Sequence, residues 1–388
     1  MIPYGRQDIT QADILAVEEV LRSDFLTQGP VVPRFEQAVA SRVNSKCAVA
    51  VNSATSALHI ACMAMGLGAD DILWTVPNTF VASANCGRYC GAKVDFVDID
   101  PLTWNISLIQ LREKLARAKE DGCLPKVLVP VHFSGQPTEQ EAIWGLAKEY
   151  GFYVLEDASH AIGASHNGEV VGSCRWSDIT VFSFHPVKII TTGEGGMALT
   201  NDEALAKRMR QLRSHGISRD ATSFQFQGKD AAPWYYEQQM LGLNYRMTDI
   251  QAALGCSQLS RLDEYIDRRN NLANQYNVAL RGLPIELPTV LSENRSAFHL
   301  YVVRPRLGDA AKTHRQMFDE LLQHGIGVNL HYIPVHLQPY YREQGFSEGM
   351  FPEAEAHGCS AITLPLYSGL TDSDQDRVIE VLVKVLTD

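Results

Sequence analysis

Short apolar runs alternate with helical patterns from about residue 45 to residue 200, and this alternation constrains the fold more than any other feature of the sequence. Several of the apolar runs contain almost no polar residue, as expected for strands that are covered on both faces. The predicted strands are KCAVAVN, DILWTV, AKVDFVDI, KVLVPVH, FYVLEDA, SDITVFSF and GGMALT. Between them lie the helical patterns TSALHIACMAMGL, TFVASANCGRYC, LIQLREKLARAKE and EQEAIWGLAKEYG. Strands alternating with helices predict an α/β fold, with a mainly parallel sheet between layers of helices.

The rest of the chain predicts a second, smaller unit. The patterns NDEALAKRMRQLRSHG and TDIQAALGCSQLSRLDEYIDRRNNLANQYNVALRG are helical, and the polar and aromatic segment between them predicts a long loop near the site or a subunit contact. After Pro284, the strand patterns HLYVVRP and GVNLHY mix with the helical patterns THRQMFDELLQHG and DQDRVIEVLVKVL. We therefore expect an N-terminal segment at 1–25, a large domain at 26–255 and a small C-terminal α+β domain at 256–388.

The net charge and the hydropathy of the sequence argue against two classes of partner, nucleic acids and membranes. The net charge of -11 argues against nucleic-acid binding, which needs a basic face. No apolar run reaches the roughly 20 residues that cross a bilayer, and the N-terminus has neither the basic nor the apolar region of a signal peptide. We expect a cytoplasmic protein without a membrane partner. The eight cysteines have no metal-ligand spacing, so buried reduced thiols are favoured over a disulfide framework or a zinc site.

A lysine and an aspartate follow two of the predicted strands. Lys188 comes after the strand SDITVFSF and before a turn rich in glycine, which allows close backbone approach. Asp157 ends the strand FYVLEDA, at the edge where open α/β sheets place ligands. A buried carboxylate needs a partner, and a protonated pyridine nitrogen is suitable. Each residue alone also has an ordinary explanation, as a surface lysine and as an aspartate that caps a turn.

The segment NSATSALHIA begins a helix with small polar residues, and such a helix start binds anions through free N–H groups and the helix dipole. Thr55 and Ser56 could add hydroxyl donors to a phosphate, although an ordinary helix cap has the same pattern. Ser183, in the strand before the lysine, could donate to the same phosphate. Phe80 could stack on a flat ring and His160 could contact that ring or its hydroxyl, although core packing explains either residue alone.

The order of these features is that of a fold-type I enzyme dependent on pyridoxal 5'-phosphate (PLP), the fold of aspartate aminotransferase. A phosphate site comes first, an aspartate ends a later strand, and a lysine follows. No G-x-G-x-x-G motif lies between a strand and a helix, and there is no P-loop or H-E-x-x-H motif. This disfavours an NAD-dependent oxidoreductase, which stays an alternative together with a non-catalytic PLP-fold regulator.

Six segments resemble the nucleotide-sugar aminotransferases of the DegT/DnrJ/EryC1/StrS group. They are NSATSALH, PNTFVASAN, EDASHAIGA, FSFHPVKIITTGEGG, RSHG and LNYRMTDIQAALG, and the resemblance covers nearly the whole chain. Within the group, the chain looks most like the enzymes of pseudaminic acid synthesis. That resemblance implies amino transfer from L-glutamate to C4 of UDP-2-acetamido-2,6-dideoxy-β-L-arabino-hexos-4-ulose, and another nucleotide keto-sugar is the alternative substrate.

The resemblance also implies roles for individual residues. Lys188 would form a Schiff base with PLP, and Asp157 would pair with the pyridine nitrogen. The other residues implied in cofactor binding are Thr55, Ser56, Phe80, His160, Ser183 and Asn244. Asn244, with Arg246 second, would complete the phosphate site of a neighbouring subunit, which makes the protein a homodimer with shared active sites. Weaker candidates for the sugar nucleotide are Tyr4, His185, His331 and Tyr332.

Two positions distinguish this chain within the group. Many relatives have glutamine at the position of His160, so the contact with the ring hydroxyl differs in detail. Some relatives have histidine in place of the lysine and act as PLP-dependent dehydratases. The presence of Lys188 favours transamination, and no metal is expected.

Overall fold

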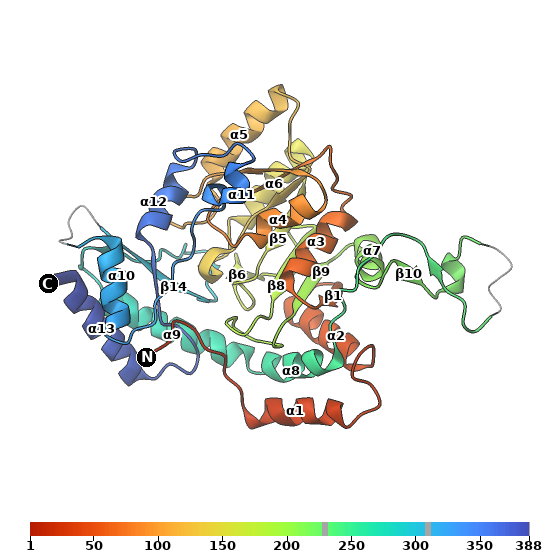
Figure 1. Cartoon of the computed structure of the whole chain (residues 1–388), viewed down its shortest axis with the longest axis horizontal. Helices are drawn as coiled ribbons and strands as arrows, with labels where there is room; N and C mark the ends of the chain where they lie inside the picture. The colour runs from red at the N-terminus through yellow and green to blue at the C-terminus, as the bar shows by residue number, and fades with distance from the viewer. Residues whose placement is uncertain (227–231, 307–311, 388) are drawn as a thin grey trace.

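A computed structural model describes residues 1–226, 232–306 and 312–387 of the chain. A seven-stranded sheet in the order β1-β9-β8-β5-β4-β2-β3 forms its centre, with helices on both faces (Figure 1). The strands are β1 (Cys47–Val51), β2 (Ile72–Thr75), β3 (Lys93–Phe96), β4 (Val127–Val129), β5 (Tyr153–Asp157), β8 (Ile179–Ser183) and β9 (Gly196–Thr200). Neighbouring strands are parallel except β9, which runs antiparallel to both β1 and β8. The predicted α/β fold with a mainly parallel sheet is confirmed.

The strands are apolar because both faces of the sheet are covered. Val49 and Val51 pack into a core shared with α3 (Ala54–Ala64), α4 (Ala82–Tyr89) and α7 (Glu203–Arg213). Ala48 and Ala50, which alternate with them along β1, pack on the opposite face with α2 (Val31–Val43) and α8 (Asp249–Leu259). Further along that face, α5 (Leu108–Glu120) and α6 (Gln140–Tyr150) cover β2, β3 and β4. Burying both faces in this way leaves only the ends of the strands for a ligand.

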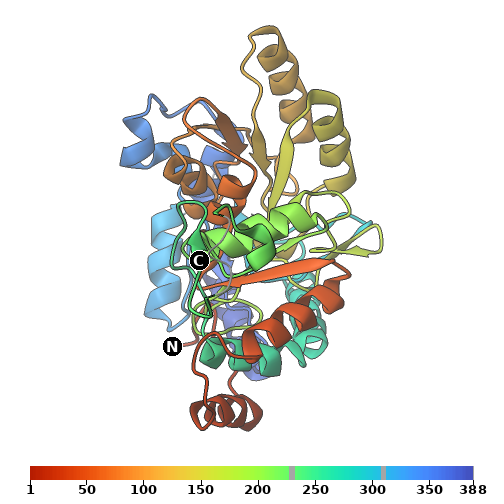
Figure 2. The same cartoon turned by 90° about the vertical axis from the view of Figure 1, so that its right-hand side faces the viewer.

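The N-terminal helix α1 (Gln11–Leu21) lies along α8, at the edge of the molecule (Figures 1 and 2). The buried Asp13 accepts hydrogen bonds from Gln258 Nε2 at 2.9 Å and from Arg261 Nη2 at 2.7 Å. The pattern from 248 to 282 forms two helices, α8 and α9 (Leu262–Ala279). The expected boundary at 255/256 falls within α8, and the domain limits stay a prediction.

The C-terminal elements pack around a second, smaller sheet in the order β12-β14-β15. Its strands are β12 (Ile285–Glu286), β14 (Tyr301–Pro305) and β15 (Ile362–Leu364). α10 (His314–Gln323) and α13 (Asp372–Thr387) pack on this sheet. α11 (Pro339–Arg342) and α12 (Pro352–Ser360) pack into the core that also contains Phe96 of β3. The predicted strand GVNLHY is wrong: Asn329 forms only an isolated bridge, to Thr363, because the segment leaves the sheet and lines a cavity.

Smaller elements complete the structure. A second three-stranded sheet contains β6 (Ser165–His166), β7 (Glu169–Val170) and β13 (Asn294–Arg295). The described parts of the polar and aromatic segment project from the molecule next to β10 (Ile217–Ser218) and β11 (Glu237–Gln238), as Figure 1 shows. Residues 227–231 of this segment lie outside the described residues. The described residues also form the one-turn 3-10 helices η1 (Phe133–Gly135), η2 (Ala221–Ser223) and η3 (Val335–Leu337).

Two sequence expectations concern the surface. All eight cysteines are free thiols, but the prediction that they are buried is wrong for Cys123 and Cys359, which are exposed. Within the described ranges, none of the helices combines the length and the apolar character needed to cross a membrane.

Candidate active site

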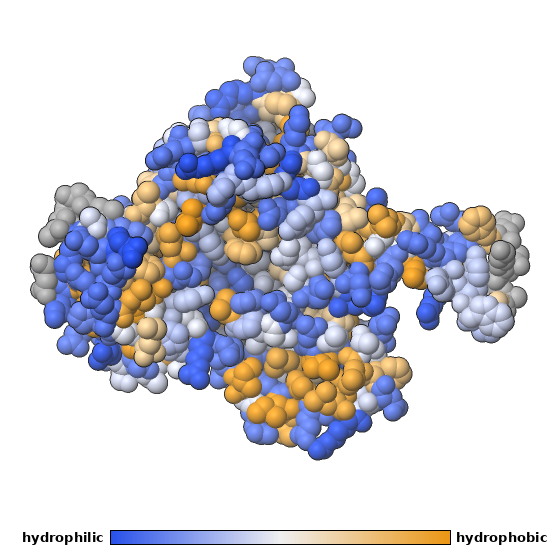
Figure 3. Space-filling view, viewed as in Figure 1, coloured by the Kyte–Doolittle hydropathy of each residue, from blue (hydrophilic) through white to orange (hydrophobic). Residues whose placement is uncertain are grey.

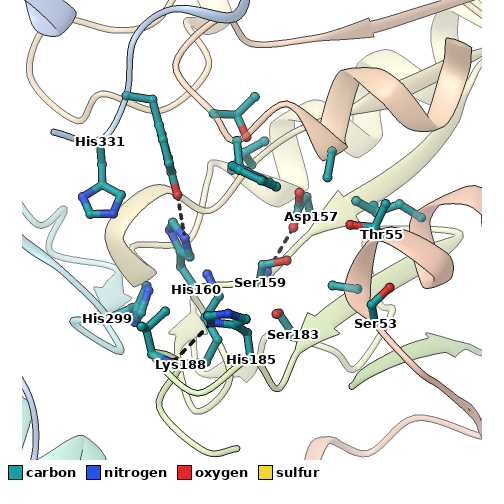
Figure 4. Close-up of a pocket in the computed structure, with 18 of the residues that line it drawn as sticks. Ser53, Thr55, Asp157, Ser159, His160, Ser183, His185, Lys188, His299 and His331 are labelled. Atoms are coloured by element: carbon teal, nitrogen blue, oxygen red, sulfur yellow. Dashed lines mark hydrogen bonds between the residues drawn. The ribbon is translucent and has the colours of Figure 1, made fainter. Parts of the chain in front are cut away.

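A cavity of about 780 Å³ lies at the carboxyl ends of β5 and β8 (Figure 4). Parallel sheets place ligands at this edge, because the loops that follow the strands converge there. The cavity brings together Tyr4, Thr55, Ser56, Phe80, Asp157, His160, Ser183, His185, Lys188, His331 and Tyr332, all of them residues that the sequence pointed to. Segments from the first four residues to position 332 therefore meet at one place.

Lys188 lies in the turn after β8, and its side chain points into the cavity (Figure 4). Its backbone N–H donates to the carbonyl of His185 at 2.8 Å, which closes the turn. Burial lowers the pKa of the Lys188 amine to about 8, while the carboxylate of Asp157 opposes that shift. A much larger fraction of this amine is therefore neutral near pH 7 to 8 than for an ordinary lysine, and a neutral amine is the nucleophilic form.

The carboxylate of Asp157 is buried and held at both oxygens. Ser83 Oγ, from α4, donates to Oδ2 at 2.6 Å, and the backbone N–H of Ser159 donates to Oδ1 at 3.1 Å. Thr79 Oγ1 lies 2.8 Å from Ser83 Oγ and extends the network. Hydrogen bonds to a charged acceptor are stronger than neutral ones, so the direction of this carboxylate is fixed.

The first turn of α3 forms the other end of the cavity. Ser53 is the N-cap, and its Oγ accepts the N–H of Ser56 at 3.1 Å. Within the described residues, the N–H groups of Ala54 and Thr55 have no hydrogen-bond acceptor. Gly196, at the start of β9, permits this arrangement, because a Cβ there would lie 2.5 Å from Ala54 N. Free N–H groups at a helix N-terminus bind anions.

Neutral imidazoles and tyrosines form the wall near the lysine. His160 Nε2 lies 3.2 Å from Tyr332 Oη, and His331 Nδ1 lies 2.8 Å from Thr363 Oγ1. Burial, then the charge of Lys188, lowers the pKa of His331 to about 3, and the same two causes hold the pKa of His160 well below its usual value. Both rings are therefore uncharged at neutral pH.

The remaining predicted residues differ in exposure. Phe80 is 58% exposed at the mouth of the cavity, so a flat ligand could lie against it. His185 is also exposed, with Nε2 3.9 Å from Glu194 Oε1. Asn244 and Arg246 do not line the cavity of their own chain. Asn244 is exposed and bridges Ser214, beside the start of α8.

Sequence reasoning missed Ser83 and His299, two residues that the structure brings to the site. Ser83 holds Asp157, and His299 lines the cavity with 4% of its surface exposed. A signal was available for Ser83 alone: it lies within the PNTFVASAN segment, one turn after Phe80. Nothing local distinguishes His299, because its place depends on a contact between distant segments.

The family model of the DegT/DnrJ/EryC1/StrS aminotransferases matches residues 7–383. The chain belongs to this family. Its members are sugar aminotransferases that use PLP, so this DegT/DnrJ/EryC1/StrS protein is a PLP-dependent aminotransferase of fold type I. This agrees with the place of Lys188 in the cavity and excludes the oxidoreductase and regulator alternatives.

Several relatives of this family member are similar over almost their whole length. The spore coat polysaccharide biosynthesis protein SpsC of Bacillus subtilis is 40% identical, over 98% of this chain and 96% of its own. Helicobacter pylori PseC, an aminotransferase of pseudaminic acid biosynthesis, is 30% identical with a TM-score of 0.89, over 99% of both chains. The aminotransferase TlmJ of Streptoalloteichus hindustanus is 29% identical with a TM-score of 0.88, over 100% of this chain and 99% of its own.

The cavity fits PLP chemically at four points. The free N–H groups of Ala54 and Thr55 suit a phosphate, and the oriented Asp157 carboxylate suits a protonated pyridine nitrogen. Lys188 supplies the amine. His160 Nδ1 is buried and has no partner among the described residues, so it is available for a polar atom of the cofactor.

Proposed function

We propose that this enzyme moves an amino group from L-glutamate to C4 of UDP-2-acetamido-2,6-dideoxy-β-L-arabino-hexos-4-ulose, in pseudaminic acid biosynthesis. The observation that carries the chemistry is the meeting of the Lys188 amine, the oriented Asp157 carboxylate and the helix start of α3 in one cavity. The similarity to PseC supports the choice of sugar.

PLP supplies an electron-withdrawing ring that stabilises negative charge on a substrate carbon. Asp157 would favour the protonated ring nitrogen, because its carboxylate is fixed and ionised groups attract a cationic partner. Lys188 would accept a proton at the substrate carbon and return it at the cofactor carbon. A pKa of about 8 suits both directions of proton transfer near neutral pH.

Neutral groups and a neighbouring subunit would recognise the anionic ligands. Thr55 and Ser183 are close to the helix start and would offer hydroxyls to the cofactor phosphate. The Ser56 hydroxyl donates to Asn52 Oδ1 at 2.7 Å, so it would have to rotate to reach the phosphate. The residues that would contact the sugar nucleotide line the same cavity and are Tyr4, His185, His331 and Tyr332. No arginine lines the cavity in the described part of this chain, so a partner copy is the natural source of further positive charge.

The surface beside Asn244 supports a homodimer that shares its active sites. Figure 3 shows an apolar area over α1 and its neighbours. Exposed apolar side chains there are Ile14, Leu15, Leu21, Phe25 and Leu26. Leu26 O accepts the N–H of Asp249 at 3.0 Å, which places this surface against the start of α8, a few residues after Asn244 and Arg246. Large exposed apolar patches mark protein interfaces, and a two-fold interface here would carry Asn244 toward a second copy.

A second substrate is also supported. Identity is higher to SpsC, which belongs to spore coat polysaccharide biosynthesis, than to PseC. A different nucleotide keto-sugar, with the keto group at C3 or with another stereochemistry at C4, would use the same lysine, aspartate and phosphate site.

Absorption spectroscopy tests the cofactor chemistry, and mass spectrometry tests the choice of sugar. The purified protein should show a visible band that L-glutamate bleaches, and Lys188→Ala should lose the response while Lys207→Ala, on the exposed face of α7, keeps it. With ¹⁵N-glutamate and a panel of UDP- and dTDP-linked keto-sugars, ¹⁵N should enter the proposed UDP-sugar fastest. If another keto-sugar is labelled fastest, that sugar is the substrate instead of the proposed one. If the protein has no visible band even after PLP is added, the whole proposal is wrong.

A further inference from the structure

His299 lies beside His160 in the cavity wall, although it belongs to a distant segment. The two ring centroids are 4.5 Å apart, with the planes tilted by 46°. Nδ1 of each ring is buried and has no hydrogen-bond partner among the described residues. A buried polar atom without a partner is unfavourable, so a pair of them at a cavity wall calls for a functional explanation.

The backbone that carries His299 is strained. Phe298, its neighbour, has a φ of 42°, which a bulky residue rarely adopts. Its N–H donates to Ser296 Oγ at 3.1 Å. Such strain persists only where surrounding contacts enforce it, most often at functional sites.

Arg269 of α9 supplies one of those contacts. Its Nη1 donates to the carbonyl oxygens of Phe298, His299 and Leu366 at 3.1, 3.1 and 3.0 Å. The side chain is 2% exposed, and no carboxylate of the described residues lies within ion-pair distance of it. Burial lowers the pKa of Arg269 to about 10, so the guanidinium is still charged at neutral pH. Burying a cation without an acid partner costs free energy, and here the buried guanidinium holds this turn of backbone by hydrogen bonds.

Gly135 supplies the contact on the other side. A Cβ at this position would lie 2.8 Å from His160 O, 2.9 Å from Phe298 N and 3.0 Å from His299 N. Its carbonyl accepts the N–H of Ala297 at 2.9 Å. Gly135 therefore lies between the two histidine segments, and its lack of a side chain allows their backbones to approach.

The charges around the pair keep both rings neutral. Burial is the main cause that lowers the pKa of His299, followed by Lys188, His160, Arg269 and His331. For His160 the causes are burial, Lys188 and His331. Tyr332 also faces His160, and burial raises the pKa of its hydroxyl, so it stays neutral as well. The cations Lys188 and Arg269 thus disfavour protonation of the histidine pair, and none of these contacts brings an anion against it.

We propose that His299 is a positioning residue for His160, and that Arg269 holds His299 in that role. The His299 ring covers one side of His160, while Tyr332 fixes Nε2 by hydrogen bonding. His160 then presents its second nitrogen in a single orientation and a single tautomer. The inference rests on the proposed contact between His160 and the cofactor.

Histidine NMR on the cofactor-free protein tests the positioning directly, with the His160 signal assigned by its loss in His160→Gln. In the wild-type protein, His160 should stay neutral in one tautomer from pH 6 to 8. In His299→Ala, water reaches the ring, so the pKa of His160 should rise toward the usual value of about 6.5, and the dissociation constant of PLP should increase about tenfold. His299→Phe keeps an aromatic ring against His160 and should bind PLP within about threefold of the wild type.

His336→Ala is the matched control, because His336 is also fully buried but contacts Glu355, away from the cavity. It should lower stability and leave His160 and PLP affinity unchanged. If His299→Ala does not fold, His299→Asn removes the ring with a smaller cavity and carries the same expectation. An unchanged His160 spectrum in a folded variant overturns the inference. The NMR result needs no PLP or sugar, so it remains informative even if the proposed reaction is wrong.

Discussion

At Lys188, burial and the charge of Asp157 act in opposite directions on the pKa of one amine. The lowered pKa of about 8 predicts that acetylation of Lys188 in the cofactor-free protein rises through pH 8 instead of through the usual 10.4 or so. Because Asp157 stabilises the charged amine, Asp157→Asn should move the midpoint lower. Competitive labelling with peptide mass spectrometry measures this, with the exposed Lys207 as reference. A Lys188 midpoint above pH 10 would contradict the desolvation argument.

Ser83 gives a second test at this scale. Ser83→Ala removes the 2.6 Å hydrogen bond to Asp157 Oδ2. A hydrogen bond to a charged group contributes about 1.5–3 kcal/mol, so kcat/KM should fall by roughly 10- to 100-fold. Ser107→Ala is the matched control, because Ser107 caps α5 and does not line the cavity. It should cost about 1 kcal/mol of stability and leave kcat/KM unchanged; equal losses of activity in both variants would mean that the effect is general.

At the scale of elements, we expect the N-cap of α3 to contribute both to the stability of the fold and to cofactor binding. Ser53→Ala should cost about 1 kcal/mol of unfolding free energy and also raise the dissociation constant of PLP several-fold, because the cap orders the turn that presents the N–H groups of Ala54 and Thr55. Thr313→Ala removes the capping box of α10 and should cost similar stability with no loss of PLP affinity. Calorimetry and spectral titration measure the two quantities. Equal PLP affinity in both variants would show that this turn does not hold the phosphate.

The elements also show where sequence reasoning succeeds. Helix α5 has the bounds that its pattern predicted, because a serine cap and an amphipathic repeat lie within the segment itself. The segment GVNLHY has a strand pattern, but its apolar and aromatic residues face a cavity and a neighbouring core instead of a continuous sheet. Lys188 and Asp157 could be predicted because strand ends converge at a sheet edge. The contact between His299 and His160 could not be predicted, because it depends on a strained turn held by Arg269.

At the scale of the whole molecule, the central question is which chain completes each active site. Asn244 lies outside the cavity of its own chain, next to an apolar surface. If a second copy covers that surface, the lysine and Asn244 of one site come from different chains. Lys188→Ala and Asn244→Ala should each inactivate or strongly impair the homodimer. A heterodimer of the two variants would then contain one intact site and one doubly defective site.

Coexpression with two different affinity tags, followed by purification over both, isolates that heterodimer. Its activity should be about half that of the wild-type dimer, because one site of two has both groups. If Asn244 served its own chain, each site of the heterodimer would lack one group, and activity would stay at the level of the single variants. A heterodimer of Lys188→Ala with wild type gives the reference for one working site. Activity in the heterodimer can therefore be restored only if one chain supplies Lys188 and the other supplies Asn244 to the same site.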